Sequence, residues 1–323
     1  MRSNACVTFT QGGVMRKMTH FLIDNAPTLS VLTVNESLAL HEGLTQFTVE
    51  PYRLHFDYVA FLAAPLDTLE VPLTLGVMGR TGRGFTLRYL PTTNQYEVTL
   101  RSPATTADWE VFLEFTLQLV HYTQGAIAVG DGLYFEGGLT SADLIDWNWR
   151  EDVLLGLLAM QTALQTAPTL ALSGCQRDVS FNRAMLNAVL QSEDPVRAFS
   201  ERYTEAQYPD AMISDQGFYK QEATDDIIGI YSLTQDQATV IPKEPVVETK
   251  HEGLLNNTPV TDWKMMFVLY DSPSDRASFR TKTMSYSRFI ELLPKDKYQW
   301  LDGGSILVHA LSQDDIKAFL SQQ

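Results

Sequence analysis

The stretch GFTLRYLPTTNQYEVTLR, residues 84–101, decides the fold. Residues 84–90 and 95–101 are rich in β-branched, aromatic and aliphatic side chains, as strands are. Residues 91–94, Pro-Thr-Thr-Asn, separate them with residue types that favour turns. The stretch therefore predicts a β-hairpin.

A helix is predicted directly after this hairpin, over residues 107–123. One apolar stripe follows from side chains spaced three and four residues apart, namely Trp109, Phe112, Leu113, Leu117 and Val120, widened by Phe115, Leu119 and Tyr122. Gly125 ends the helix, and residues 126–129 resume as a strand. We expect a strand–strand–helix–strand unit in which Trp109 and Phe112 are buried against a sheet.

A similar order of elements is predicted near the C-terminus. Residues 263–270 and 278–284 have strand composition, 286–293 predict a helix ended by Pro294, and 306–309 predict a strand. Residue identity between the two units is negligible. Duplication is therefore one hypothesis, and the other is that this order is a common way to cover a sheet with a helix.

The middle of the chain is predicted to be helical, over residues 149–165, 180–190 and 194–206. Asp194-Pro195 is a strong start, with aspartate as the N-cap and proline at the first helical position. Capping boxes of the Thr-x-x-Glu and Ser-x-x-Asp kinds begin further helices at Thr33 and Ser312. We predict the α+β class, with mixed or antiparallel sheets covered by helices.

Three stretches are assigned on weaker patterns. Residues 52–62 alternate well enough to predict a strand, and residues 167–175 interrupt the helical pattern and predict a loop. Residues 242–262 hold three prolines and an Asn-Asn pair, so we expect a long exposed loop there.

Four segments follow from these patterns. Residues 1–17 are expected to be a non-native or disordered extension, with Met15 or Met18 as the true start. Residues 18–140 are expected to form a β-rich domain containing the buried helix. Residues 141–209 are expected to form a helical middle segment, and residues 210–323 an α+β domain. Lysine is concentrated after residue 200, which supports a boundary there.

Composition indicates a soluble globular protein. The 323 residues are 45% hydrophobic and 20% charged, which suffices for a core of ordinary size. The formal net charge is −15, whereas binding to nucleic acid or to an anionic membrane requires a surplus of lysine and arginine. We therefore expect neither partner.

The two cysteines, Cys6 and Cys175, are too few for a disulfide scaffold. The apolar run at residues 153–160 is too short to span a bilayer. These features predict a protein of a reducing cytoplasm.

Residues 79–84, Gly-Arg-Thr-Gly-Arg-Gly, have the composition of an anion-binding loop. Arg80 and Arg83 are the candidate anion contacts. A phosphate-binding loop, however, places its amides at a helix N-terminus, and here a strand follows. The alternative is a glycine-rich turn with two solvated arginines.

Acidic and aromatic residues are concentrated near residue 147. The candidate contact surface consists of Asp143, Asp146, Trp147, Trp149 and Asp152. Aromatic residues are favoured as interface anchors, and neighbouring carboxylates can bind a divalent metal or perform acid–base chemistry. The alternative is that acids near a helix N-terminus serve the helix dipole.

The sequence assigns no catalytic residue. Cys175 could be a nucleophile with Arg177 nearby, but a lone cysteine is more often buried and inert. The histidines lack zinc-binding spacing, and the chain has neither a nucleophile elbow nor a dinucleotide fingerprint. We expect neither a metal site nor a cofactor.

The chain resembles an uncharacterised family of Gram-positive bacterial cytosolic proteins, classed as a domain of unknown function. The resemblance rests on residues 84–87, 102–119, 149–156 and 307–320. It covers nearly everything after Met18. The family implies no known activity, cofactor or catalytic residue.

Two functions remain open from the sequence. The first is a non-catalytic binding or regulatory protein that contacts a protein partner or a second copy of itself; a toxin-neutralising or phage-related accessory role also fits the acidity. The second is a hydrolase that uses carboxylates, with or without a metal. A pocket that joins Asp143, Asp146 or Asp152 to Glu222, Asp225 or a histidine would favour the hydrolase.

Overall fold

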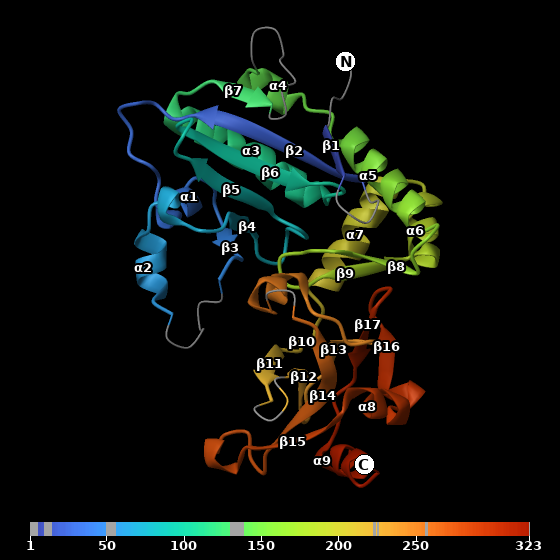
Figure 1. Ribbon diagram of the computed structural model, residues 1–323. Coiled ribbons are helices and arrows are strands. Elements are labelled where there is room, and N and C mark those ends of the chain that lie inside the picture. Colours follow the sequence, from blue (N-terminus) through green and yellow to red (C-terminus); the bar gives the residue numbers. More distant parts are fainter. Residues whose placement is uncertain are drawn as a thin grey trace. The chain divides into compact units, whose positions relative to one another are not determined.

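The computed structural model describes residues 6–9, 15–49, 56–129, 139–221, 224, 226–255 and 258–322 (Figure 1). The chain divides into two compact units. Unit 1 comprises residues 1–170, 174–176 and 186–207, and unit 2 comprises residues 171–173, 177–185 and 208–323. Both units combine helices with sheets, which confirms the predicted α+β class.

Unit 1 is built on one antiparallel sheet with the strand order β1-β2-β6-β5-β4-β3, in which β7 also pairs with β2. Its strands are β1 (Cys6–Phe9), β2 (Met15–Asp24), β3 (Leu44–Gln46), β4 (Leu73–Val77), β5 (Phe85–Leu90), β6 (Gln95–Arg101) and β7 (Ile127–Val129). The predicted hairpin is confirmed as β5–β6, with Leu87 opposite Val98. Asn94, the last residue of its turn, has a φ of 54°.

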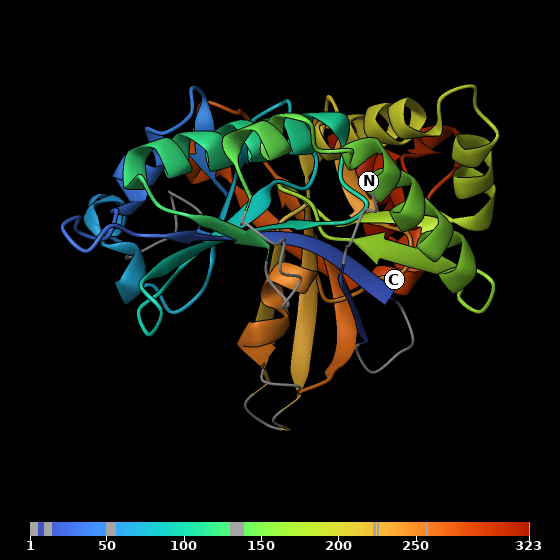
Figure 2. The same ribbon diagram turned by 90° about the horizontal axis from the view of Figure 1, so that it is seen from above.

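Helix α3 (Thr106–Thr123) packs against this sheet, as Figure 2 shows from above. Trp109 and Phe112 are fully buried, which confirms the main prediction from the sequence. The Phe112 ring stacks on Phe21 of β2 with the centroids 5.4 Å apart. The face turned to the sheet runs through Phe112, Phe115 and Leu119 rather than through the predicted Leu113 and Leu117, which are only partly buried.

The other helices within the described part of residues 1–207 are α1 (Val34–Leu38), α2 (Tyr58–Ala63), η1 (Leu66–Thr68), α4 (Ser141–Ile145), α5 (Trp149–Ala163), α6 (Arg183–Leu190) and α7 (Pro195–Gln207). The capping box at Thr33 is confirmed, because Thr33 and Glu36 bond each other reciprocally. The predicted start at Asp194 is also confirmed. Its Oδ1 accepts hydrogen bonds from the amides of Val196 and Arg197 at 3.1 and 3.2 Å.

Three assignments from the sequence were wrong. Where a strand was predicted at 52–62, the described residues form α2. This helix begins after Asp57, whose Oδ1 accepts a hydrogen bond from the Ala60 amide, and residues 52–55 lie outside the described ranges. The predicted loop at 167–175 contains strand β8 (Thr169–Leu172). The predicted helix from Ser180 begins later, because residue 180 lies in β9 (Val179–Asn182) and the Asn182 side chain caps α6.

Unit 2 contains two four-stranded mixed sheets, ordered β10-β13-β17-β16 and β11-β12-β14-β15. The first consists of β10 (Met212–Ile213), β13 (Thr239–Pro242), β16 (Tyr298–Trp300) and β17 (Ser305–Val308), and the second of β11 (Gln216–Lys220), β12 (Ile227–Thr234), β14 (Val260–Leu269) and β15 (Arg280–Ser285). The pairs β10–β13 and β12–β14 are parallel, and the others are antiparallel. The described part of the predicted loop at 242–262 holds the short helix η2 (Thr249–Leu255) and the first residues of β14.

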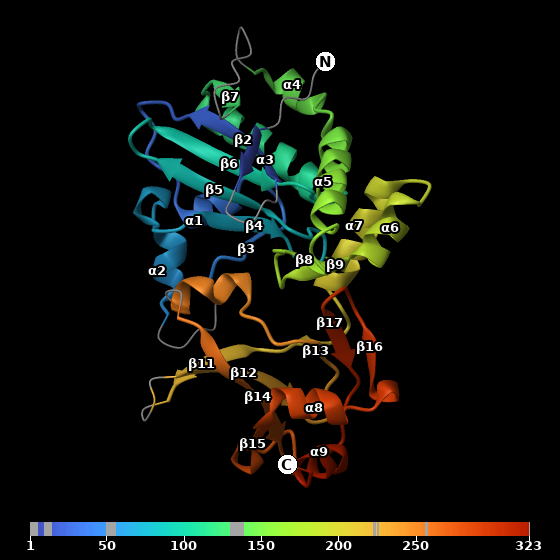
Figure 3. The same cartoon turned by 45° about the vertical axis from the view of Figure 1, so that its right-hand side comes forward.

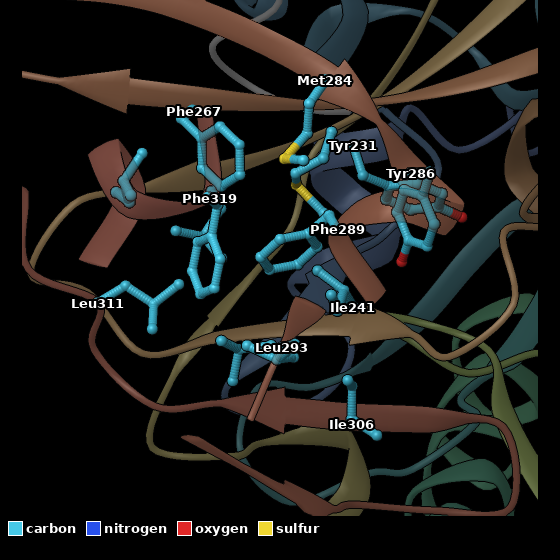
Figure 4. Close-up of a cluster of buried hydrophobic side chains, with 14 of the residues drawn as sticks. Tyr231, Ile241, Phe267, Met284, Tyr286, Phe289, Leu293, Ile306, Leu311 and Phe319 are labelled. Carbon is cyan, nitrogen blue, oxygen red and sulfur yellow. The ribbon is translucent and has the colours of Figure 1, made fainter. Parts of the chain in front are cut away.

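One hydrophobic core joins both sheets of unit 2 to helices α8 (Tyr286–Leu292) and α9 (Gln313–Leu320) (Figure 4). Phe289 of α8 contacts Phe267 and Phe319, with ring centroids 5.4 and 5.6 Å away. Two short helices, η3 (Arg276–Ser278) and η4 (Lys295–Lys297), lie in the connections. Strands of both sheets supply side chains to this core, so the core of unit 2 depends on both sheets.

The two predicted strand–strand–helix–strand units share an order but not a topology. In unit 1 the strands β5, β6 and β7 belong to one sheet. In unit 2 the strands β14 and β15 belong to one sheet and β17 to the other. Strand β16 also intervenes before β17.

A buried ion pair fixes the turn between β16 and β17. Arg177, 5% exposed, donates from Nη2 to Asp302 and to Ser305 Oγ, the latter at 2.6 Å. The second Asp302 oxygen accepts from the amides of Gly304 and Ser305, each at 2.8 Å. The turn is therefore bonded to the segment 177–185 within unit 2.

Candidate functional site

The predicted contact surface lies on α4 and α5, and its first acid caps a helix. Thr140 is the N-cap of α4, and its amide and hydroxyl donate to Asp143 Oδ2 at 2.8 and 2.6 Å. These hydrogen bonds hold the pKa of the Asp143 carboxyl below its usual range. Asp143 is exposed, so it stays ionised on the surface while it caps α4.

Trp147 and Asp152 are bonded to each other beneath the start of α5. Trp147 Nε1 donates to Asp152 Oδ2 at 3.1 Å, and its ring meets the edge of Phe21 at 5.2 Å. Asp152 is 1% exposed, and its carbonyl accepts from Ser102 Oγ at 2.9 Å. This pair attaches α5 to strand β2, which is a structural role.

Trp149 and Asp146 lie nearer the surface. The Arg150 guanidinium lies 5.8 Å from the centre of the half-buried Trp149 ring, and it pairs with Asp194 at 2.8 Å. Asp146 is exposed at the C-terminus of α4. Of the five predicted residues, Asp143 and Asp146 therefore face solvent.

Residues 153–160 of α5 are apolar on every side of the helix. Val153, Leu157 and Met160 face inward and are buried, whereas Leu154, Leu155 and Leu158 are 39%, 43% and 51% exposed. We call these three exposed residues the α5 leucine patch. Leu154 and Leu155 are both neighbours of Leu158 on the helix surface, because they lie four and three residues before it.

A close approach fixes which face of α5 points inward. A Cβ atom on Gly156 would lie 2.5 Å from Ser102 Oγ and 2.8 Å from the Pro103 nitrogen. Only glycine allows this contact, so the opposite face, with the α5 leucine patch, must point outward. Figure 3 shows α5 beside the sheet of unit 1, with α4 at its N-terminal end.

The N-terminal end of the patch is acidic. Asp143, Asp146 and Glu151 are exposed, and the only base among residues 141–165 is Arg150, which pairs with Asp194. We call Asp143, Asp146 and Glu151 the acidic rim. The surface therefore combines three leucines with negative charge.

The predicted anion contacts Arg80 and Arg83 have partners within unit 1. Arg80 Nη2 lies 2.7 Å from Glu110 Oε2, and Arg83 Nη1 donates to the Pro103 carbonyl at 2.9 Å. The loop amides of Arg83 and Gly84 donate to the buried carboxylate of Asp108. The loop thus binds the N-terminus of α3; contact with an external anion stays a prediction.

Cys175 packs beside the same loop. Its amide donates to the Gly82 carbonyl at 3.0 Å, and its Sγ lies 3.6 Å from Thr81 Oγ1. A Cβ on Gly84 would approach this Sγ to 3.1 Å. These contacts place the thiol in the packing around a glycine-rich turn.

The structure describes only some of the carboxylates that the hydrolase would use, so that function stays a prediction. In the described part of the chain, no group of three or more histidine, cysteine, aspartate or glutamate residues is placed to hold a metal ion. Glu222 and Asp225 lie outside the described residues. Within the same ranges, every helix is too short or too polar to cross a lipid bilayer.

The outward leucines are the feature that sequence reasoning missed. The helical period that predicts a helix over residues 149–165 runs through Val153, Leu154, Leu157 and Leu158 without separating an inner from an outer face. The signal was present, because a run that is apolar on every side cannot be buried entirely by one neighbouring layer.

Comparison with known proteins gives one match. A family profile described as Domain of unknown function (DUF4299) matches residues 18–319. Neither the curated proteins nor the solved structures contain a match to this chain. The expected resemblance to an uncharacterised family is thus confirmed, whereas its Gram-positive cytosolic origin stays a prediction.

Proposed function

Because the chain belongs to the family described as Domain of unknown function (DUF4299), whose description names no activity, we propose its function from its own surface. The chain binds another protein through the α5 leucine patch and the acidic rim. The observation that carries this proposal is the exposure of Leu154, Leu155 and Leu158 on one face of a helix.

The patch is an anchor rather than a complete interface. Full burial of a leucine side chain stabilises a complex by about 1.5–3 kcal/mol, so three half-exposed leucines would contribute roughly 3 kcal/mol. A micromolar complex needs about 8 kcal/mol. The partner must therefore also contact the surroundings, where Ile145 is 70% exposed and the acidic rim lies.

The charge of the surface specifies the chemistry of the partner. Residues 141–165 expose three acids, which form the acidic rim, and one base, Arg150; the fourth acid, Asp152, is buried. A partner helix with leucine-like side chains flanked by lysine or arginine would complement both features. We therefore propose a basic amphipathic segment of another protein as the ligand.

A second copy of the chain is the poorer occupant. Self-association through this face would bring two acidic rims together, on chains of net charge −15 each. Like charges placed opposite each other oppose association. Molar mass measured by light scattering at 10 and 100 μM tests this alternative directly.

The test uses a fluorescein-labelled helical peptide of leucine and lysine, with leucine on one face, titrated by fluorescence anisotropy. The wild-type chain is compared with the patch variant L154S/L155S/L158S. The control variant V59S/V71S/M78S removes three apolar side chains of unit 1 that are 77%, 57% and 54% exposed elsewhere.

We expect the patch variant to bind the peptide at least tenfold more weakly than the wild type, with the control variant unchanged. A leucine–glutamate peptide should not bind. Equal affinity of the patch and control variants would show that the acidic chain attracts any basic peptide, and it would overturn the proposal. Circular dichroism checks that each variant is folded.

A further inference from the structure

A segment of unit 2 is hydrogen-bonded to side chains of two neighbouring strands, β11 and β12. We call residues 243–251 the strap. Residues 243–248 connect β13 to η2, and residues 249–251 are the first residues of η2. At its far end, the Thr249 amide and hydroxyl donate to Asp178 Oδ2 at 3.1 and 2.6 Å. The sequence predicts an exposed loop over residues 242–262, which include this stretch.

One side chain holds the middle of the strap by its backbone. Gln216 Nε2 donates to the Val246 carbonyl at 2.7 Å, and Gln216 Oε1 accepts from the Glu248 amide at 3.0 Å. An adjacent β-strand would make the same pair of bonds, to the carbonyl of one residue and the amide two residues later. The amide of Gln216 therefore recognises an extended backbone independently of its side chains.

Two further groups complete this contact. Tyr231 Oη donates to the same Val246 carbonyl at 2.7 Å, and His251 Nδ1 lies 2.9 Å from Gln216 Oε1. Burial raises the pKa of Tyr231 far above its ordinary value, so the hydroxyl remains a donor.

Aromatic rings surround the contact. Trp263 stacks on Tyr231 with a centroid distance of 5.4 Å, and Phe218 meets the edges of Trp263 and His251 at 6.1 and 5.8 Å. Trp263 lies flat over Gly229, where a Cβ atom would come within 2.4 Å of the indole. Trp263 and Phe218 are both only partly buried.

The contacts at the middle of the strap are made by its backbone. Val246 is 55% exposed, and Gln216 bonds the Val246 carbonyl and the Glu248 amide. Such contacts exchange readily with those of another extended chain, because they do not depend on a unique side-chain fit.

We infer that Gln216, Tyr231, Trp263 and Phe218 form a binding site for an extended peptide, and that the strap occupies this site as an internal ligand. Release of the strap exposes the site to an extended segment of another protein. The site lies in unit 2 and the α5 leucine patch in unit 1, so either proposal can fail while the other stands.

The first test measures hydrogen exchange by mass spectrometry in the wild type, Q216A and the control Q299A, whose glutamine is exposed on β16. We expect strap amides in Q216A to exchange at least tenfold faster, with the amides of β12 and β14 unchanged and Q299A equal to the wild type. Unchanged exchange of the strap amides, or faster exchange throughout unit 2, would overturn the inference that Gln216 holds the strap in the site.

The second test asks whether the site binds a peptide in trans. The probe is acetyl-KEPVVETKH-amide, which repeats residues 243–251, added at millimolar concentration to a variant with a disrupted strap, P245G/V246S/V247G/E248S. We expect the Trp263 indole NMR signal to shift in this variant, but not in the wild type, where the strap occupies the site. The same variant carrying Q216A should not respond.

Two outcomes would overturn the peptide site. One is an equal shift in the wild type and the disrupted variant, which indicates binding elsewhere. The other is the lack of any shift in a disrupted variant whose remaining spectrum matches the wild type, which shows that the empty site does not bind an extended chain.

Discussion

The carboxylate of Asp108 is predicted to contribute far more to stability than the equivalent carboxylate of another capping box in unit 1. Asp108 is fully buried. Its Oδ2 accepts from the amide and hydroxyl of Thr105 at 2.8 Å each, and its Oδ1 from the Gly84 amide at 2.8 Å. The Arg83 amide lies 3.0 and 3.1 Å from the two oxygens.

The change Asp108→Asn keeps the shape but removes one acceptor. Whichever way the amide is oriented, its NH₂ faces the amide of either Thr105 or Gly84, and a buried amide without an acceptor costs about 1–3 kcal/mol. The remaining hydrogen bonds become weaker because their acceptor is no longer ionised, which costs roughly 1 kcal/mol in total. Burial raises the pKa of Asp108 against the effect of these bonds, so removing the charge returns part of the loss. We expect a net destabilisation of about 2–4 kcal/mol.

Glu36→Gln is the matched control. Glu36 accepts from the amide and hydroxyl of Thr33 at 2.8 and 2.9 Å, but it is exposed, and among the described residues the hydrogen bonds of its carboxylate go to Thr33 alone. An exposed cap is worth about 0.5–1 kcal/mol. Native-state hydrogen exchange of peptides from α3 measures the difference, and we expect at least tenfold faster exchange in D108N than in E36Q, since about 1.4 kcal/mol corresponds to a factor of ten. Equal exchange in the two variants would refute the account of Asp108.

Hydrogen bonds from Thr33 lower the pKa of Glu36, so the contribution of its carboxylate to stability is present above the unfolded value of 4.5 and is lost as the pH falls below it. The stability difference between the wild type and E36Q, measured by urea unfolding, should therefore shrink between pH 5 and 3. Burial raises the pKa of Tyr96 to about 12, so the contribution of its neutral hydroxyl to stability is lost as the pH rises from 10 to 12. In an absorbance titration, Tyr96→Phe should lack one tyrosine that ionises late in the wild type. A wild-type titration that is complete by pH 11 would contradict this. Gly156→Ala should lower the melting temperature measured by circular dichroism, because the new Cβ meets the Pro103 backbone, whereas the control Gly217→Ala, with open space around it, should not.

The sequence predicted the parts of the fold in which local chemistry and burial agree. The capping residues Thr33 and Ser312, the hairpin at residues 84–101 and the helix from residue 107 all follow from short-range patterns, and the structure confirms them. The stripe of α3 was displaced from Leu113 towards Phe115, because the sheet covers the face that carries the larger rings.

Other parts depend on contacts that no local pattern encodes. Asp57 could not be recognised as a cap because its neighbours alternate like a strand. Residues 169–172 lie between Pro168 and Ser173-Gly174, whose turn chemistry conceals β8. The pairing of residues 305–308 with β13 rather than β14 is a long-range choice, so the second unit could be predicted in order but not in topology.

The candidate site shows the same limit. The sequence located the α4–α5 region, but it selected tryptophans as anchors. Trp147 instead bonds the buried Asp152 and contacts Phe21, which lies more than a hundred residues away in the sequence. Its role as a structural residue, and the outward direction of Leu158, both depend on where β2 lies, and only the folded chain supplies that information.

The ion pair between Arg177 and Asp302 has a consequence for how the protein can be divided. Residues 177–185 belong to unit 2, although residues 186–207 return to unit 1. A fragment that starts at residue 208 would therefore keep Asp302, 2% exposed in the intact chain, and lose the guanidinium that neutralises it. No single cut yields two self-sufficient halves, so gene fusion, truncation or recombination at the apparent boundary would leave both pieces incomplete.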